Sequence, residues 1–228
     1  LSESESNNFT ISSTLTLTNV TSRKRTVLQS DCLQQKVLNT LKFINCKLRT
    51  KHCHEKADTV TVGTWNVRTL WQTGKLELMK RELSRMRYDI VGISEVRWTG
   101  SGELMNGRMV FAGEERKHEK GVAIVMSERA HKALIGYLPI SPRVMAARFR
   151  GDPFNLTVIQ AYAPTADSTD EEVEEFYEQV EEGLQYAHKR DIRIVMGDWN
   201  AKIGKDNIGW EEEMGVYGIG ERNDRGER

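Results

Sequence analysis

The chain has 228 residues, with 33 Lys plus Arg balanced by 33 Asp plus Glu, so it carries no formal net charge. No run approaches the roughly 18 to 20 apolar residues of a membrane-spanning helix, and the N-terminus lacks the features of a secretory signal. We therefore expect a soluble intracellular protein with no membrane partner. A neutral total leaves a nucleic-acid partner open, because a basic groove can lie within it.

Residues 1–58 differ from the rest of the chain. Ser, Thr and Asn dominate the first 22 positions, and the basic run Arg23-Lys24-Arg25 follows. Such a composition usually stays disordered, although the apolar spacing from Val27 to Phe43 allows one amphipathic helix. We expect a disordered or partly helical extension at 1–58, and a folded domain at 59–228.

All three cysteines, Cys32, Cys46 and Cys53, lie in this extension. An odd, sparse set does not make a disulfide framework, which favours a reducing compartment. The cluster Lys51-His52-Cys53-His54 is either a zinc-site fragment or a solvated loop, and the lack of a Cys-x-x-Cys pair favours the loop.

The folded part opens with a predicted strand, helix and strand. From Thr59 to Trp65, Val alternates with Thr, as in a β-strand. A helix beginning near Gly74 then places four apolar side chains on one face: Leu76, Met79, Leu83 and Met86. A strand from Tyr88 to Ser94 follows, so the two strands are expected to be parallel.

The middle of the chain reads as five strands with short connections, for which antiparallel pairing is expected. They are 109–112, 121–126, 134–140, 144–150 and 154–162. Ser168 with Glu171, or Thr169 with Glu172, can then cap a helix whose other face carries a solvated run of glutamates. A strand at 191–197 completes a second strand, helix, strand unit. A mixed sheet or two packed sheets, with pseudo-twofold halves, is implied.

Polar residues follow four of these strands. Ile194 to Asn200 reads Ile-Val-Met-Gly-Asp-Trp-Asn, an apolar run that delivers Asp198 and Asn200. The other strands deliver Asn66, Glu95 and Tyr162. Open α/β sheets bind ligands at such strand ends, and two strands that end in carboxylates indicate a metal site.

Four motifs in this order resemble the endonuclease/exonuclease/phosphatase superfamily, to which deoxyribonuclease I belongs. Within it, the chain is similar to the endonucleases of RTE-type non-LTR retrotransposons and to the related craniofacial development protein 2-like proteins. The motifs are Thr64-Trp65-Asn66-Val67-Arg68, Ile93-Ser94-Glu95, Gln160-Ala161-Tyr162-Ala163-Pro164-Thr165 and Gly197-Asp198-Trp199-Asn200-Ala201.

The resemblance implies an α/β fold, a two-layered β-sandwich flanked by helices, and a Mg²⁺- or Mn²⁺-dependent hydrolase of DNA phosphodiesters. Glu95 would bind the metal, and Asn66 would orient Glu95 or reach the metal through water. Asp198 would position or deprotonate the attacking water. Asn200 would hold that water or a phosphate oxygen, and Tyr162 would donate to the phosphate.

The superfamily completes its site with a later Asp and a closing Ser-Asp-His motif, which are absent before Arg228. The resemblance therefore implies an incomplete domain that lacks its C-terminal strands, and a chain with weak or no activity. Two alternatives stay open: a non-catalytic binding protein or truncated product of the same fold, and a phosphatase of inositol phosphates or lipids. Whether the source is a retroelement or a domesticated gene also stays open, as does a nuclear location.

Substrate contacts outside these motifs are less specific. Arg97 and Trp98, with Arg108 beyond them, could meet a base or the backbone, although packing of the Trp at a sheet edge is favoured. Arg68 is equally suited to a phosphate contact or to the surface.

Overall fold

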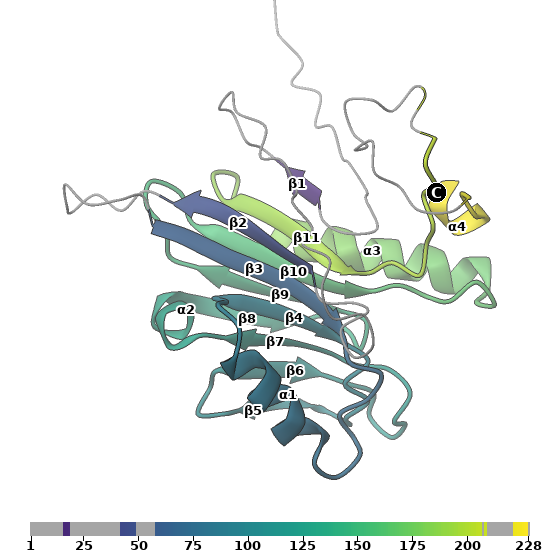
Figure 1. Cartoon of the computed structure of the whole chain (residues 1–228). Coiled ribbons are helices and arrows are strands. Elements are labelled where there is room, and N and C mark those ends of the chain that lie inside the picture. Colours follow the sequence, from purple (N-terminus) through teal and green to yellow (C-terminus); the bar gives the residue numbers. More distant parts are fainter. Residues whose placement is uncertain (1–15, 19–41, 49–57, 207, 209–220, 228) are drawn as a thin grey trace, which may run out of the picture.

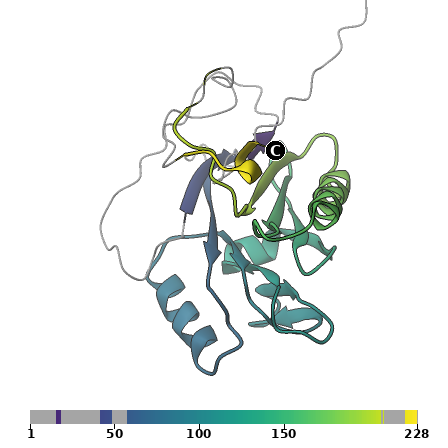
Figure 2. The ribbon, with the colours of Figure 1, turned by 90° about the vertical axis from the view of Figure 1, so that its right-hand side faces the viewer.

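The computed structural model describes residues 16–18, 42–48, 58–206, 208 and 221–227, and the side chains only within 59–206, 208 and 221–226. Two β-sheets pack face to face, and one long helix lies on the outer face of each (Figures 1 and 2). The α/β sandwich predicted from the sequence is confirmed. Within the described residues, no helix is long and apolar enough to cross a membrane.

The first sheet contains six strands in the order β2-β3-β4-β7-β6-β5. Their bounds are β2 Lys42–Leu48, β3 Asp58–Asn66, β4 Ile90–Ser94, β5 Ser101–Leu104, β6 Met109–Ala112 and β7 Val122–Met126. Helix α1 (Lys75–Ser84) connects β3 to β4, and these two strands are parallel, as predicted. The remaining pairs are antiparallel.

The second sheet contains five strands in the order β1-β11-β10-β9-β8. Their bounds are β1 Thr16–Thr18, β8 Leu134–Pro139, β9 Val144–Phe149, β10 Leu156–Tyr162 and β11 Ile192–Asp198. Helix α3 (Asp170–Tyr186) connects the parallel strands β10 and β11, which confirms the second strand, helix, strand unit.

Side chains cap the N-terminal ends of two helices, and one of these caps was predicted from the sequence. Of the two capping pairs, the structure uses Thr169, whose hydroxyl accepts from the Glu172 amide at 3.3 Å. The short helix α2 (Glu128–Ala133) is capped by Ser127 in the same way, at 3.2 Å from the Ala130 amide. A last turn, α4 (Asp224–Glu227), lies near the start of α3.

The apolar side chains form three layers. The central layer lies between the sheets and contains residues of both, among them Val62, Ile124, Met145, Val158 and Ile194. Met79 and Leu83 attach α1 to the outside of the first sheet, and Phe176 and Val180 attach α3 to the outside of the second. Because both faces of the central strands are covered, β4, β7 and β10 are buried along their whole length.

The described residues contain five elements that the sequence did not predict, and two of them, β1 and α4, have only three and four residues. Strand β5 lies between the predicted strands 88–94 and 109–112, where no element was expected, since its residues are mostly exposed and show no alternation. Helix α2 has only six residues, too few for a helical period to show. Strand β2 pairs with β3 where disorder or the end of a helix was expected. The rest of that helix, 27–41, and the cluster at 51–54 lie outside the described residues.

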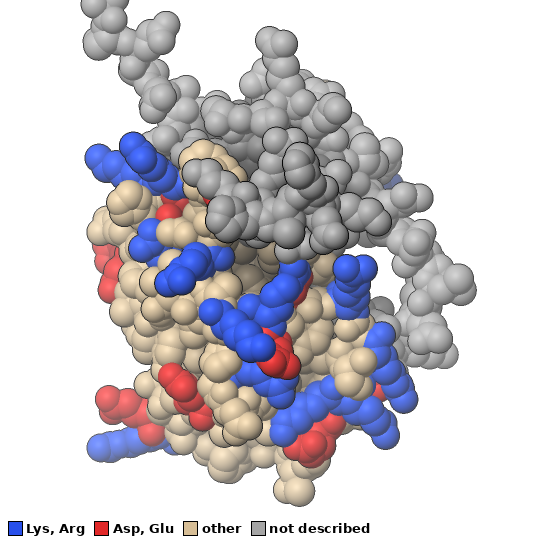
Figure 3. Space-filling model, turned by 90° about the vertical axis from the view of Figure 1, so that its left-hand side faces the viewer, with Lys and Arg blue, Asp and Glu red and all other residues tan. Residues whose placement is uncertain are grey.

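Two ion pairs with buried carboxylates lie at the end of the sandwich where β4 and β11 begin. Asp89 accepts from Arg129 at 2.6 and 3.0 Å, and Asp191 accepts from Arg148 at 2.6 and 3.0 Å. Figure 3 shows this end, where Lys and Arg side chains are interspersed with Asp and Glu. The opposite end carries the strand termini that the sequence singled out.

Candidate active site

The side chains predicted to act together come from the C-terminal ends of four strands. Asn66 is the last residue of β3, and Glu95 directly follows β4, its neighbour in the first sheet. Tyr162 and Asp198 are the last residues of β10 and β11, and they are paired in register. The packing of the two sheets brings both pairs to one edge.

The amide of Asn66 joins the two carboxylates. Its Nδ2 donates to Glu95 Oε1 at 2.8 Å and to Asp198 Oδ2 at 2.7 Å, so a single nitrogen connects the two sheets. Its Oδ1 accepts from the backbone amide of Arg68 at 2.9 Å. Ionised carboxylates only accept and a backbone N–H only donates, so these partners determine which way the amide faces.

Glu95 is held by a second donor. Arg97 Nη2 lies 2.8 Å from Glu95 Oε2, and the Glu95 side chain is only 14% exposed. Both residues have left-handed backbone conformations, with φ of 60° and 56°. Non-glycine residues rarely adopt this region, and such strain concentrates at functional sites. The chain thus turns sharply after β4, and both carboxylate oxygens of Glu95 receive a hydrogen bond.

Asp198 is placed by the residues on either side of it. At Gly197, with φ of 155°, a Cβ would lie 1.9 Å from the Ala161 carbonyl oxygen, so only glycine allows β11 to approach β10 this closely. Trp199 is buried against Phe176, and the backbone amide of Asn200 donates to Asp198 Oδ1 at 3.1 Å. Because Trp199 points into the interior, the residues on either side of it, Asp198 and Asn200, face the site.

Asn200 also has an identified partner, because its Nδ2 donates to the Ala163 carbonyl at 2.7 Å. Its backbone is left-handed as well, with φ of 47°. The amide side chain thus secures the loop that follows β10, beside Tyr162.

Tyr162 lies under a guanidinium that the sequence did not indicate as part of the site. Arg143 Cζ is 5.4 Å from the Tyr162 ring centre, and Arg143 Nη1 donates to the Tyr162 carbonyl at 3.2 Å. Burial raises the pKa of Tyr162, as do the charges of Glu95 and Asp198, while Arg143 and Arg97 oppose the increase. The phenol therefore stays protonated at neutral pH and can donate a hydrogen bond. In the sequence, the one indication of this contact is an Arg directly before a buried strand.

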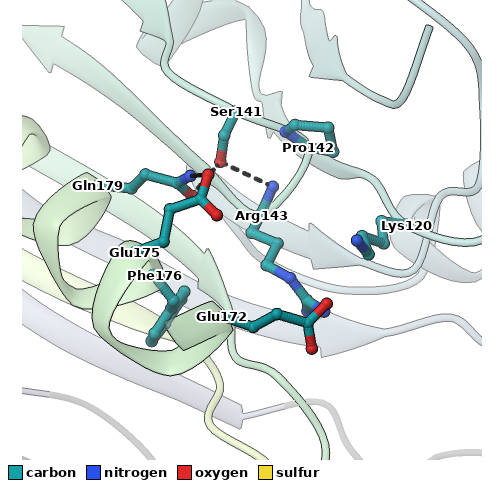
Figure 4. Close-up of a pocket in the computed structure, with 8 residues that line it drawn as sticks. All are labelled: Lys120, Ser141, Pro142, Arg143, Glu172, Glu175, Phe176 and Gln179. Atoms are coloured by element: carbon teal, nitrogen blue, oxygen red, sulfur yellow. Dashed lines mark hydrogen bonds between the residues drawn. The ribbon is translucent and has the colours of Figure 1, made fainter. Parts of the chain in front are cut away.

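A pocket of about 100 Å³ lies between Arg143 and α3 (Figure 4). The loop 141–143 forms one wall, and the first half of α3 forms the other. Arg143 extends along it toward Glu172, and Ser141 is held by Gln179, with their oxygens 2.6 Å apart. Burial lowers the pKa of Arg143, but the neighbouring tyrosine and glutamates oppose this, so the guanidinium remains charged.

The donor set fits one hard divalent cation. Among the described residues, no three His, Cys, Asp or Glu side chains converge. Two carboxylates do converge on the Asn66 amide, and Mg²⁺ is commonly held by one or two carboxylates with water and substrate phosphates completing its shell. Because the Asn66 oxygen is already engaged by Arg68, the geometry suits Asn66 as the group that orients Glu95.

The residues suggested as substrate contacts outside the four motifs have different surroundings in the structure. Arg68 is exposed next to the site. Trp98 packs edge to face on Phe111, with ring centres 5.2 Å apart, so its indole is a packing residue at the edge of the sheet. Arg108 donates to the Met105 carbonyl at 3.4 Å within its own loop.

Proteins with related sequences include craniofacial development protein 2 of Bos taurus and of Tragulus javanicus, each 41% identical over 169 residues, or 73% of this chain. The chain spans only 28% and 29% of the length of these relatives.

Solved structures with related folds have low sequence identity. The endonuclease domain of TRAS1, a telomere-specific non-LTR retrotransposon, is 20% identical with a TM-score of 0.45, over 73% of this chain and 65% of that one. An AP endonuclease of Leishmania major is 16% identical with a TM-score of 0.48, over 62% and 55%.

The profile of the Endonuclease/Exonuclease/phosphatase family matches residues 63–214, a range that contains all five predicted site residues and most of both sheets. The chain therefore belongs to the Endonuclease/Exonuclease/phosphatase family.

Proposed function

We propose that this domain hydrolyses phosphodiester bonds of DNA with Mg²⁺ or Mn²⁺. The observation that carries the proposal is the Asn66 amide, which joins Glu95 and Asp198 across the two sheets at 2.8 and 2.7 Å. Two carboxylates that share one neutral donor form an anionic centre with the composition of a hard-cation site. Family membership supports chemistry on phosphate esters.

Each residue has a distinct task in this proposal. Glu95 holds the cation, which when bound neutralises phosphate charge, and Asn66 and Arg97 keep Glu95 in place. Asp198 accepts the proton of the attacking water, while the Asn200 amide restrains the carboxylate. Tyr162 donates a hydrogen bond to a phosphate oxygen as negative charge develops there, and the leaving oxygen takes a proton from solvent as its bond to phosphorus breaks.

The charges beside the carboxylates favour a polyanionic substrate. Arg68, Arg97 and Arg143 flank the site and can contact phosphates on either side of the scissile bond. A nuclear location, where DNA would be available, and a retroelement origin belong to the same proposal. Weak turnover of this chain, expected from the sequence, remains a prediction that activity measurements test.

Nicking of supercoiled plasmid tests the function. Because weak turnover is expected of this chain, the assay uses protein in excess over plasmid and long incubation, and we expect slow formation of relaxed circles in Mg²⁺ or Mn²⁺ and none in EDTA. The rate should fall at least about 100-fold in Asp198→Ala and Glu95→Gln, since each removes a group that acts in the transition state. Glu182→Gln, on the exposed face of α3, is the matched control and should cleave like the unmodified chain.

Two outcomes would contradict the proposal. Cleavage that persists unchanged in Asp198→Ala would show that Asp198 does not act in the reaction. Release of phosphate from inositol phosphates, without any nicking of DNA, would favour the phosphatase alternative.

A further inference from the structure

An exposed aromatic stack lies beside the candidate site. The rings of Trp71 and His118 are nearly parallel, with an interplanar angle of 24° and centroids 3.6 Å apart. Trp71 is 58% exposed, whereas Trp65 and Trp199 are 8% and 6% exposed. Packing among the described residues explains the two buried indoles but not the exposed one.

Local contacts hold this indole in place although it is exposed. The preceding residue, Leu70, is buried and donates its amide to the Val96 carbonyl at 3.1 Å. The Trp71 amide donates to Thr69 Oγ1 at 3.1 Å. A large apolar surface is therefore presented to solvent on an anchored loop, which reduces the conformational entropy lost when a ligand stacks on it.

The second ring is tied directly to the site. His118 Nδ1 lies 2.8 Å from the Arg97 carbonyl oxygen, and the Arg97 side chain holds Glu95 at 2.8 Å. Trp71 itself follows Asn66 by five positions along the same chain segment. The stack is thus connected to Glu95 through Arg97, and to Asn66 along the chain.

Three positive side chains lie near the stack along the chain, and the loop of His118 also carries the exposed Glu115 and Glu119. Arg68 precedes Trp71 on its loop, and Arg116 and Lys117 directly precede His118; all three are exposed. A flat aromatic surface bordered by cations matches the chemistry of a nucleic-acid strand, with its anionic backbone and apolar base faces. It matches an inositol phosphate poorly, because such a ligand offers no π-face.

We propose that Trp71, backed by His118, is a stacking platform for an unpaired nucleobase that flanks the scissile phosphodiester. The location relative to the scissile bond rests on the proposed function. A base inside a duplex already has both faces covered, so only a single-stranded, frayed or extruded base can stack on the indole. The structure therefore assigns to this site a preference for nucleic acid with unpaired bases next to the cut.

Binding of fluorescein-labelled oligonucleotides in Ca²⁺, and again in EDTA, tests the platform. The probes are a short mixed-sequence single strand and the same strand in a blunt duplex. Trp71→Ala should weaken single-strand binding about 10-fold, the usual cost of removing one stacked base, and should change duplex binding less than about 2-fold. Trp71→Phe should recover most of the affinity.

Two further variants sharpen the test. His118→Ala should weaken single-strand binding by less than Trp71→Ala, because the indole remains but loses its backing ring. Phe154→Ala is the matched control, since Phe154 is 48% exposed at the other end of β10 and should bind both probes like the unmodified chain. Quenching of indole fluorescence by the single strand should fall in Trp71→Phe.

Binding and cleavage give separate answers. Equal binding by Trp71→Ala and the unmodified chain, or no binding of the single strand by the unmodified chain, overturns the platform whether or not plasmid is nicked. A single-strand preference that depends on Trp71, without any nicking, supports the platform and overturns the proposed hydrolysis.

Discussion

The Arg143 guanidinium carbon lies 5.4 Å from the centre of the Tyr162 ring, and the same guanidinium donates to the Tyr162 carbonyl at 3.2 Å. One cation thus contacts both the side chain and the backbone of a residue expected to touch the substrate. Arg143 therefore both positions Tyr162 and places a positive charge beside its ring.

Arg143→Lys separates these two contributions. The ammonium keeps the charge but cannot reproduce the planar contact with the ring together with the bond to the carbonyl. We expect nicking to fall about 10-fold, which corresponds to about 1.4 kcal/mol of transition-state stabilisation, with a smaller change in DNA binding. Arg190→Lys, exposed at the far end of the domain, should have no effect. Equal losses in both variants would argue against a positioning role for Arg143.

Asn66→Asp changes the one neutral group between two carboxylates into a third carboxylate. Without a cation, three neighbouring negative charges repel each other, so the melting temperature should fall below that of the unmodified chain. Mg²⁺ should then raise the melting temperature of the variant by more than it raises that of the unmodified chain, because a ligand that binds only the folded state stabilises it. Thermal denaturation with Mg²⁺ and with EDTA measures both effects. Melting curves that do not respond to Mg²⁺ would count against a cation site here.

Gly92→Ala should disturb a buried polar group between the sheets. Gln160 is fully buried, its Nε2 donates to Ser94 Oγ at 2.9 Å, and a Cβ at Gly92 would lie 1.7 Å from Gln160 Oε1. The clash forces the side chain of Gln160 away from its partner, so we expect a loss of about 2–4 kcal/mol in the free energy of unfolding, measured with urea.

Two controls accompany this substitution. Adding Gln160→Ser to Gly92→Ala should recover part of the lost stability, because the shorter side chain leaves room for the new methyl group. Gly102→Ala meets only the Phe111 ring at 3.4 Å and should change stability by less than about 1 kcal/mol. A destabilisation at Gly92 that Gln160→Ser does not relieve would point to another cause.

Asp191 should make the domain sensitive to acid. Burial alone would raise the pKa of Asp191, but hydrogen bonds from Arg148 and Thr157 outweigh it, so the pKa lies below its usual range. A carboxylate with a lowered pKa stabilises the fold above its unfolded pKa of about 3.9, and this contribution is lost as the pH falls through the folded value.

Asp191→Asn should therefore lower stability at neutral pH by about 3 kcal/mol and should flatten the dependence of stability on pH below about pH 5. Urea denaturation across this range gives both quantities. Asp167→Asn, in an exposed loop, is the control and should keep the acid dependence of the unmodified chain. A variant that keeps the same slope would assign the acid sensitivity to other carboxylates.

The periodic elements were predictable because their signals are local. Alternating Val and Thr gave β3, the spacing of Met79 and Leu83 gave α1, and both parallel pairs followed from their connecting helices. Strand β5 was not predictable, because an exposed edge strand with polar residues has no periodic pattern.

The residues of the candidate site were likewise predictable from local signals, whereas the contacts between them were not. Asn66, Glu95, Tyr162 and Asp198 could be recognised in the sequence because each ends or follows an apolar strand, and strand ends of parallel units meet at one edge. Only the tertiary structure decided that one amide of Asn66 serves Asp198, 132 residues away, as well as Glu95. The Arg143 contact and the stack of Trp71 on His118 likewise depend on the packing of separate segments, and no local pattern records which loops that packing brings together.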